Sequence, residues 1–63
     1  MRTQFDVGDL VRVKALPGIS MATFFDGEIG VIARLPTSNH YCYEVYIDDR
    51  TLWLVTPELE FIQ

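Results

Sequence analysis

Apolar and polar residues alternate along most of the chain, and turn-forming residues interrupt the alternation at short intervals. A period of two is typical of half-buried β-strands, whereas amphipathic helices repeat every three to four residues. The pattern therefore predicts an all-β domain. Five strands are expected, over Asp9–Ala15, Gly27–Leu35, Tyr41–Asp48, Thr51–Val55 and Glu60–Ile62.

The alternation also indicates which strand faces are buried. In the third strand we expect the odd-numbered residues to lie inside, namely Tyr43, Val45 and Ile47. The fourth strand is ambiguous, because its sequence Leu52–Val55 is apolar on both faces. Either Leu52 and Leu54 or Trp53 and Val55 must therefore lie outside the core.

Proline, glycine and short polar stretches mark the connections. Pro17-Gly18 ends the first strand, because proline lacks a backbone donor and glycine tolerates positive φ. The segment Ile19–Asp26 contains the apolar run Met21–Phe25, and a helix this short is marginal on its own. We expect an ordered loop there, folded over one end of the domain. Pro36–Asn39 predicts a turn, and Asp49-Arg50 a tight hairpin.

Two local features refine this picture. Thr56–Leu59 predicts one helical turn, with Thr56 as its cap, Pro57 at the first helical position and Glu58 near the positive end of the turn. Gly27 and Gly30 flank Glu28-Ile29 in the second strand. Glycine within a strand indicates a bulge or a close backbone approach.

Size and composition limit the chain to a single domain spanning residues 1–63. The chain is 49% hydrophobic and 22% charged, which is the composition of a globular protein and not of a disordered one. Its apolar runs are too short to span a membrane, which takes about 20 residues. A chain this short buries only about 60% of its unfolded surface, so a deep catalytic cleft would cost core that it needs.

Charge and cysteine content narrow the function further. Nine acidic and five basic residues give a net charge of −4. This negative charge disfavours binding to the phosphate backbone of nucleic acids and to anionic membranes. It is compatible with binding to a basic protein partner. One unpaired cysteine fits a reducing compartment. With no signal-peptide pattern at its start, the chain is expected to be cytoplasmic and complete from Met1.

Three segments resemble a known superfold. Gly8–Val13 combines Gly-Asp with alternating valines, Gly27–Ile32 is a strand that begins with paired glycines, and Val55–Ile62 is a closing turn and strand. With five strands and one helical turn before the last, the chain resembles SH3-like small β-barrels over nearly its whole length. Its first half resembles KOW-type barrels. The resemblance implies a single five-stranded SH3-like barrel, similar to those that act as accessory subunits of redox or photosynthetic complexes.

The chain departs from that family in its loops. KOW-type barrels that bind RNA or ribosomes carry basic loops, which this sequence lacks, and its first loop is longer and more apolar. Small barrels also host many unrelated functions, so the resemblance bears on the fold more than on the activity.

Candidate catalytic and metal-binding residues are sparse. His40, Cys42 and Glu44 would share one strand face but would spread over about 13 Å, whereas structural zinc usually takes four ligands around one point. Cys42 with His40 could form a nucleophile and base, but no basic residue lies nearby in the sequence to activate the thiol. We therefore predict no catalytic residue, metal or cofactor, and a protein that is not an enzyme.

Apolar residues outside the core are the better functional clue. An outward apolar row on a small barrel must be covered by a loop or by a partner, and large apolar patches mark protein contacts. The run Met21–Phe25 is one candidate cover. The partner-binding residues that we predict are Tyr46, Trp53, Leu52, Phe24 and Phe25.

The predicted function is a non-catalytic protein-binding module that acts as a small accessory, assembly or regulatory subunit. Self-association through edge strands is an alternative form of this function. A KOW-type contact to RNA, ribosome or RNA polymerase through Arg12, Lys14 and Arg34 is the second hypothesis, and the net charge opposes it. The short length of the chain would also be compatible with a phage protein.

Overall fold

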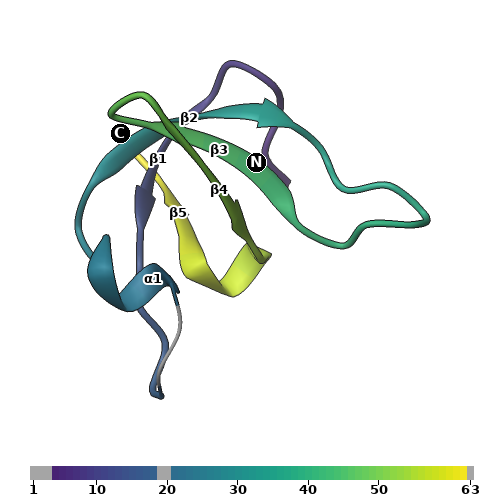
Figure 1. Cartoon of the computed structure of the whole chain (residues 1–63). Helices are drawn as coiled ribbons and strands as arrows, with labels where there is room; N and C mark the ends of the chain where they lie inside the picture. Colours follow the sequence, from purple (N-terminus) through teal and green to yellow (C-terminus); the bar gives the residue numbers. More distant parts are fainter. Residues whose placement is uncertain (1–3, 19–20, 63) are drawn as a thin grey trace.

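Five short antiparallel strands form one sheet, as the alternation predicts (Figure 1). The structure is a computed structural model that describes residues 4–18 and 21–62. The strands are β1 (Leu10–Val13), β2 (Ile29–Arg34), β3 (Tyr43–Ile47), β4 (Arg50–Leu54) and β5 (Leu59–Phe61). A short helix α1 (Met21–Phe24) lies between β1 and β2, and a 3-10 turn η1 (Thr56–Glu58) precedes β5.

The sheet order is β4-β3-β2-β1-β5, with every neighbouring pair antiparallel. The first four strands form a meander, and β5 returns to pair with β1 through Val11 opposite Phe61 and Val13 opposite Leu59. The expected closed barrel is wrong in one respect, because β4 and β5 remain the two free edges of the sheet. β4 and β5 run in the same direction, so pairing them would take a crossover of about a dozen residues, whereas only Val55 and the short turn η1 join them.

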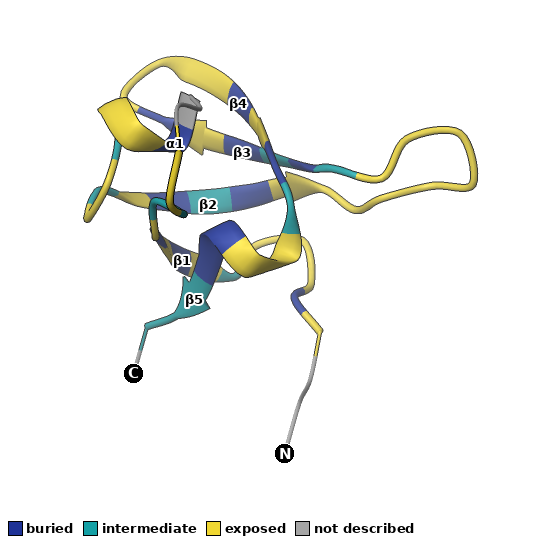
Figure 2. Ribbon diagram, turned by 90° about the horizontal axis from the view of Figure 1, so that it is seen from below, coloured by how far each residue is buried: buried dark blue, intermediate teal, exposed yellow. Residues whose placement is uncertain are grey.

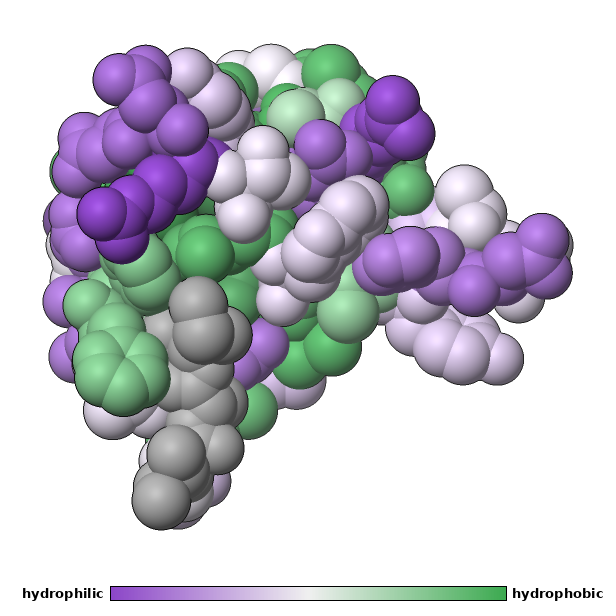
Figure 3. Space-filling model, viewed as in Figure 1, coloured by the Kyte–Doolittle hydropathy of each residue, from purple (hydrophilic) through white to green (hydrophobic). Residues whose placement is uncertain are grey.

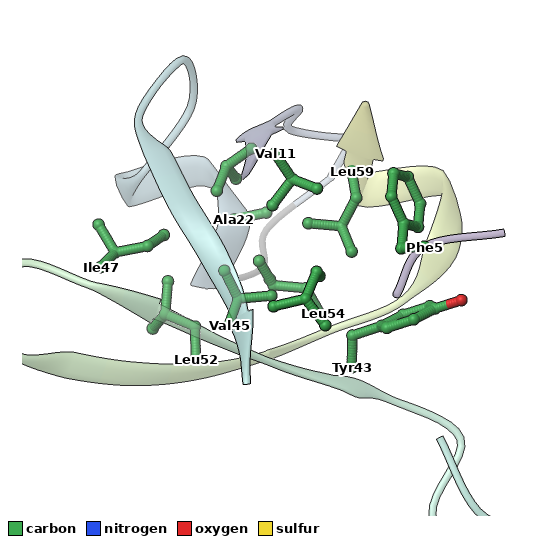
Figure 4. Packing of buried hydrophobic residues seen from close by; sticks show 11 residues of the cluster. Phe5, Val11, Ala22, Tyr43, Val45, Ile47, Leu52, Leu54 and Leu59 are labelled. Carbon is green, nitrogen blue, oxygen red and sulfur yellow. The ribbon is translucent and has the colours of Figure 1, made fainter. Parts of the chain in front are cut away.

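The core lies on the inner face of the curled sheet (Figures 2 and 4). Tyr43, Val45 and Ile47 are buried, which confirms the predicted face of β3. In β4 the ambiguity is resolved, because Leu52 and Leu54 are buried whereas Trp53 is 49% exposed. The buried apolar residues form one cluster: Phe5, Val11, Val13, Ala22, Ile32, Tyr43, Val45, Ile47, Leu52, Leu54 and Leu59.

Phe5 is a core residue that the strand pattern did not reveal, because it precedes the first strand. Its ring lies 5.5 Å from that of Tyr43 in an edge-to-face arrangement and 4.3 Å from that of Phe61. These contacts attach the N-terminal segment across the ends of β3 and β5. The three rings therefore close one end of the core.

Two connections differ from their predictions. Part of the expected loop forms the helix α1, because Ala22 is fully buried in the core and holds this turn against the sheet. Ile19 and Ser20, which belong to the same expected loop, lie outside the described residues. The β3–β4 turn consists of Asp48 and Asp49, not Asp49-Arg50. Both aspartates have positive φ, 47° and 64°, as a two-residue type I′ hairpin requires.

The turn before β5 is capped by a side chain other than the predicted one. Val55 precedes η1, which places Thr56 inside the turn and leaves the predicted threonine cap unformed. Instead the backbone N–H of Val55 donates to Oε1 of Glu58 at 3.0 Å, and the Glu58 N–H donates to the Val55 carbonyl at 2.8 Å. Glu58 is buried, so this reciprocal pair defines how the chain passes from β4 into β5.

Gly30 lies close against β3, which confirms the expected close approach. A Cβ at this position would lie 2.5 Å from Cγ1 of Ile47 and 2.8 Å from the carbonyl oxygen of Tyr46. A register shift also occurs between Ile32 and Arg34, so the second strand contains an irregularity as well. Glycine is therefore required by packing at this point, not by φ.

We predict that Gly30→Ala destabilises the protein by about 1–3 kcal/mol, because the added methyl overlaps backbone that cannot move aside. Thermal unfolding followed by circular dichroism measures the change, which amounts to roughly 4–8 °C per kcal/mol for a domain of this size. Ala33→Ser, at an exposed position of the same strand, is the control and should stay within about 0.5 kcal/mol. An unchanged melting temperature for Gly30→Ala would contradict the packing argument.

We predict that Glu58→Ala costs about 1–3 kcal/mol, because the Val55 N–H loses its acceptor. Glu58→Gln keeps an acceptor oxygen at the same place and should recover more than half of that loss. Urea unfolding of the two variants and the parent measures the difference. Equal destabilisation by both substitutions would show that the carboxylate charge matters, not the cap geometry.

Candidate functional site

The outer face of the sheet carries the apolar residues that the core does not use. The strand register places Leu10 opposite Val31 and Val31 opposite Tyr46, so these three residues form a continuous row across β1, β2 and β3. Ile29 lies two residues along β2, and Trp53 lies on β4 diagonal to Tyr46. We call Leu10, Ile29, Val31, Tyr46 and Trp53 the outer apolar surface.

Tyr46 is held in place at the centre of this surface. Its hydroxyl donates a hydrogen bond of 2.9 Å to Oδ1 of Asp49 in the β3–β4 turn. The hydrogen bond raises the pKa of the Tyr46 phenol above its usual value, because only the protonated phenol can donate to the Asp49 carboxylate, and desolvation adds to the rise. The ring therefore presents an apolar plane whose polar end already has a partner.

Trp53 is partly covered by a residue from the β2–β3 loop. The His40 ring lies 4.3 Å from the indole, inclined by 36°. Nδ1 of His40 accepts a hydrogen bond of 3.3 Å from the backbone N–H of Cys42, which orients the imidazole. This stack could not be predicted from the sequence, because His40 and Trp53 lie on different segments and no sequence pattern pairs them.

Ion pairs border the outer apolar surface at two places. Arg12 lies 3.4 Å from Glu60 across β1 and β5, and Arg34 lies 3.2 Å from Glu44 across β2 and β3. Both pairs are exposed on at least one side, so each contributes little to folding stability. Their main effect is that the positive charges of Arg12 and Arg34 are neutralised by carboxylates on the outer face of the sheet.

The structure brings together only part of the predicted partner-binding set. Tyr46 and Trp53 lie on the outer apolar surface, but Leu52 is buried in the core, so its predicted place on that surface is wrong. The reason is the strict alternation along β4, which directs Leu52 and Trp53 to opposite faces. Phe24 is 75% exposed on α1, and Phe25 packs against the core.

Two residues of the run Met21–Phe25, Ala22 and Phe25, lie on the inner side of the sheet, whereas Trp53 is on the outer side. Ala22 and Phe25 pack toward the core cluster, and the guanidinium of Arg50 lies 6.0 Å from the Phe25 ring. The segment that was expected to cover the outward apolar residues therefore packs on the inner side of the sheet. On the outer side it is His40 that contacts the indole.

Two of the three candidate metal-ligating side chains, those of His40 and Glu44, have other partners. His40 stacks on Trp53, the backbone N–H of Cys42 donates to His40, and Glu44 pairs with Arg34. Cys42 has a half-buried free thiol, and it is the backbone N–H of this residue that donates to the imidazole. Among the described residues, no group of three His, Cys, Asp or Glu side chains could hold a metal ion.

The candidate nucleic-acid residues do not form one cluster. Arg12 lies opposite Ile29 at the start of β2, whereas Arg34 is at its end, about 16 Å away at the usual rise per residue. Arg12 and Arg34 are each paired with a carboxylate. Lys14 is exposed just beyond β1.

A surface pocket of about 280 Å³ lies over the closed end of the core. The lining residues are Gln4, Phe5, Asp6, Leu35, Pro36 and Tyr43. Phe5 and Tyr43 are buried members of the core cluster, so the pocket is a hollow above the aromatic packing. Asp6 donates its backbone N–H to Oδ2 of Asp9 at 2.8 Å, which fixes the chain along the pocket rim.

Comparison with known proteins assigns no family. The chain matches no protein-family model, no curated protein sequence and no solved structure. In the part of the chain that the structure describes, no helix is long and apolar enough to cross a membrane. The candidate site therefore rests on the geometry of the outer apolar surface.

We predict that the Tyr46 phenol titrates above the usual tyrosine value and that Asp49→Asn moves its pKa back toward that value. The folded-state pKa is raised, so this hydrogen bond stabilises the fold below the unfolded-state pKa, and its contribution is lost as the pH rises through the folded-state value. Titration of the Tyr46 ¹³Cζ resonance measures both pKa values. Identical titration curves for the parent and Asp49→Asn would contradict the assigned cause.

Proposed function

We propose that this chain is a non-catalytic protein-binding module, which acts as a small accessory, assembly or regulatory subunit. The outer apolar surface is its contact site. The observation that carries the proposal is the row Leu10–Val31–Tyr46 across three adjacent strands, with Trp53 beside it. Large apolar and aromatic side chains gathered on one exposed face are typical of protein interfaces.

The composition of the surface supports a protein partner. Tyrosine and tryptophan supply large contact areas at low conformational cost, and both are enriched at binding hot spots. Tyr46 is 45% exposed although its hydroxyl is hydrogen-bonded, so its ring can be buried by a partner without leaving a polar group unpaired. Trp53 is oriented by its stack with His40, which reduces the ordering cost of binding.

The topology supports an SH3-like arrangement as the scaffold. The strand order β4-β3-β2-β1-β5 and the single 3-10 turn before β5 agree with that resemblance. Small β-domains of this kind present their outer strands and loops to other molecules, and the activity resides in the surface. A cytoplasmic location, which the free thiol of Cys42 favours, belongs to the same proposal.

The charge distribution does not favour the KOW-type alternative. Binding to a phosphate backbone needs unpaired bases that can displace counterions. Arg12 and Arg34 are held in ion pairs, and the chain as a whole carries a net charge of −4. We therefore propose no contact to RNA.

The proposal predicts a partner that depends on the outer apolar surface. The test is a pull-down from nuclease-treated lysate of the organism that encodes the chain, with the parent, Tyr46→Ala and Trp53→Ala as baits. We expect a protein that remains bound at high salt to be lost, by at least about tenfold, from both variants, because truncating a central aromatic residue commonly costs 2 kcal/mol or more.

Tyr41→Ala is the matched control. Tyr41 is an aromatic residue with 81% exposure, but it lies on the β2–β3 loop outside the outer apolar surface. Capture should be unchanged by this substitution, and each variant is first shown to be folded. Capture that disappears with nuclease, or that all three variants retain equally, would refute the proposal.

A further inference from the structure

The β4 edge is a second exposed feature, in addition to the outer apolar surface. Within the described residues, β4 is the terminal strand on its side of the sheet and pairs only with β3. The positive φ angles of Asp48 and Asp49 define a two-residue hairpin. In such a hairpin the flanking residues, Ile47 and Arg50, exchange both backbone hydrogen bonds.

The alternation of an antiparallel ladder then determines which groups face outward. Because Arg50 bonds to β3, the backbone groups of Leu52 and Leu54 also point to β3. The N–H and C=O groups of Thr51 and Trp53 point to the open side. Within the described residues, no hydrogen bond from another segment reaches these groups.

The β4 edge lacks the devices that usually protect an edge strand. Natural edges are kept short or are interrupted by proline, bulges or inward charges. β4 has five residues in regular register, and apart from Arg50 at its start it carries no charge and no proline. The other edge, β5, has only three residues and follows directly on η1, which contains Pro57. Strand addition is therefore favoured at β4.

Apolar surface lies directly beside this edge. In Figure 1, β4 crosses the front of the molecule, and Figure 3 shows hydrophobic surface in the region between β4 and α1. Phe25 is only partly buried there. A strand added to β4 would place alternate side chains over this surface and the intervening ones beside Trp53.

Charge favours a basic occupant. The ion pairs Arg12–Glu60 and Arg34–Glu44 are each neutral, so the net charge of −4 resides on the remaining groups. Asp48 and Asp49 are exposed at the hairpin, next to the start of β4, and they outnumber the one basic residue there, Arg50. A second copy of the chain would add its own net charge of −4 to the complex, whereas a positively charged segment would complement the two aspartates.

We infer that β4 binds an extended, positively charged segment of a partner protein, which joins the sheet as an added strand with alternating apolar side chains. The inference rests on the proposed function and names its binding mode. The backbone groups of Thr51 and Trp53 supply the hydrogen bonds, and the surface between β4 and α1 receives the apolar side chains. Main-chain pairing supplies affinity, and alternate side chains supply specificity.

The test uses a displayed library of random 12-residue peptides, selected against the intact chain. Enriched peptides should carry a positive net charge and alternate apolar with basic or polar residues. Their affinity should fall at least about threefold between 50 and 500 mM NaCl, because salt screens exposed charges. N-methylation at alternate backbone nitrogens should weaken binding by about tenfold or more, and methylation at the intervening nitrogens should have little effect.

A pair of substitutions tests the protein side of the contact. Thr51→Pro removes the outward N–H without removing a bond to β3, and proline is tolerated at edge positions of this kind. It should weaken the peptides about tenfold, whereas Thr51→Val keeps the N–H and should bind like the parent. If Thr51→Pro fails to fold, the N-methylation pattern decides alone.

Other outcomes overturn the inference, and they separate it from the proposed function. Peptides that are lost with Trp53→Ala but tolerate N-methylation everywhere would leave the outer apolar surface standing and refute strand addition. Acidic or proline-rich peptides, or no enrichment, would also refute it, while the pull-down still tests the proposed function independently. A dimer in sedimentation velocity that Thr51→Pro converts to monomer would make a second copy the occupant.

Discussion

A single sheet has to enclose its own core in this protein, and most of its features follow from that constraint. With 63 residues there is no second layer large enough to cover an apolar sheet face. The sheet therefore curls, and the inner residues of β2, β3 and β4 pack against those of β1 and β5. Curling brings β2 close to β3 at Gly30, where a side chain larger than hydrogen would overlap backbone.

The same constraint explains why large apolar residues lie on the outer face. Side chains alternate between the two faces of a strand, so each core residue leaves its neighbours outside. On β4 this separates Leu52 and Leu54 from Trp53, and on β3 it separates Val45 from Tyr46. Tyr46 and Trp53 are the outward residues on which the proposed contact is built.

Much of the fold could be predicted from local patterns. The five strands, the buried face of β3 and the turn before β5 all follow from alternation and turn chemistry within short windows. The features that could not be predicted from the sequence depend on contacts between residues that are distant in the chain. Sheet closure depends on how β4 and β5 are joined, and the stack of His40 on Trp53 depends on where the β2–β3 loop projects. The placement of Leu52 became decidable only with the register of β4 against β3.

The position of Trp53 has a practical consequence. It is the only tryptophan of the chain, it lies next to the free edge of β4, and it is in contact with the imidazole of His40. Indole emission responds to solvent exposure and to neighbouring groups, so the protein carries an intrinsic optical probe at its candidate contact site. Events at that site can be followed in the unmodified chain, without a label that would disturb the small domain.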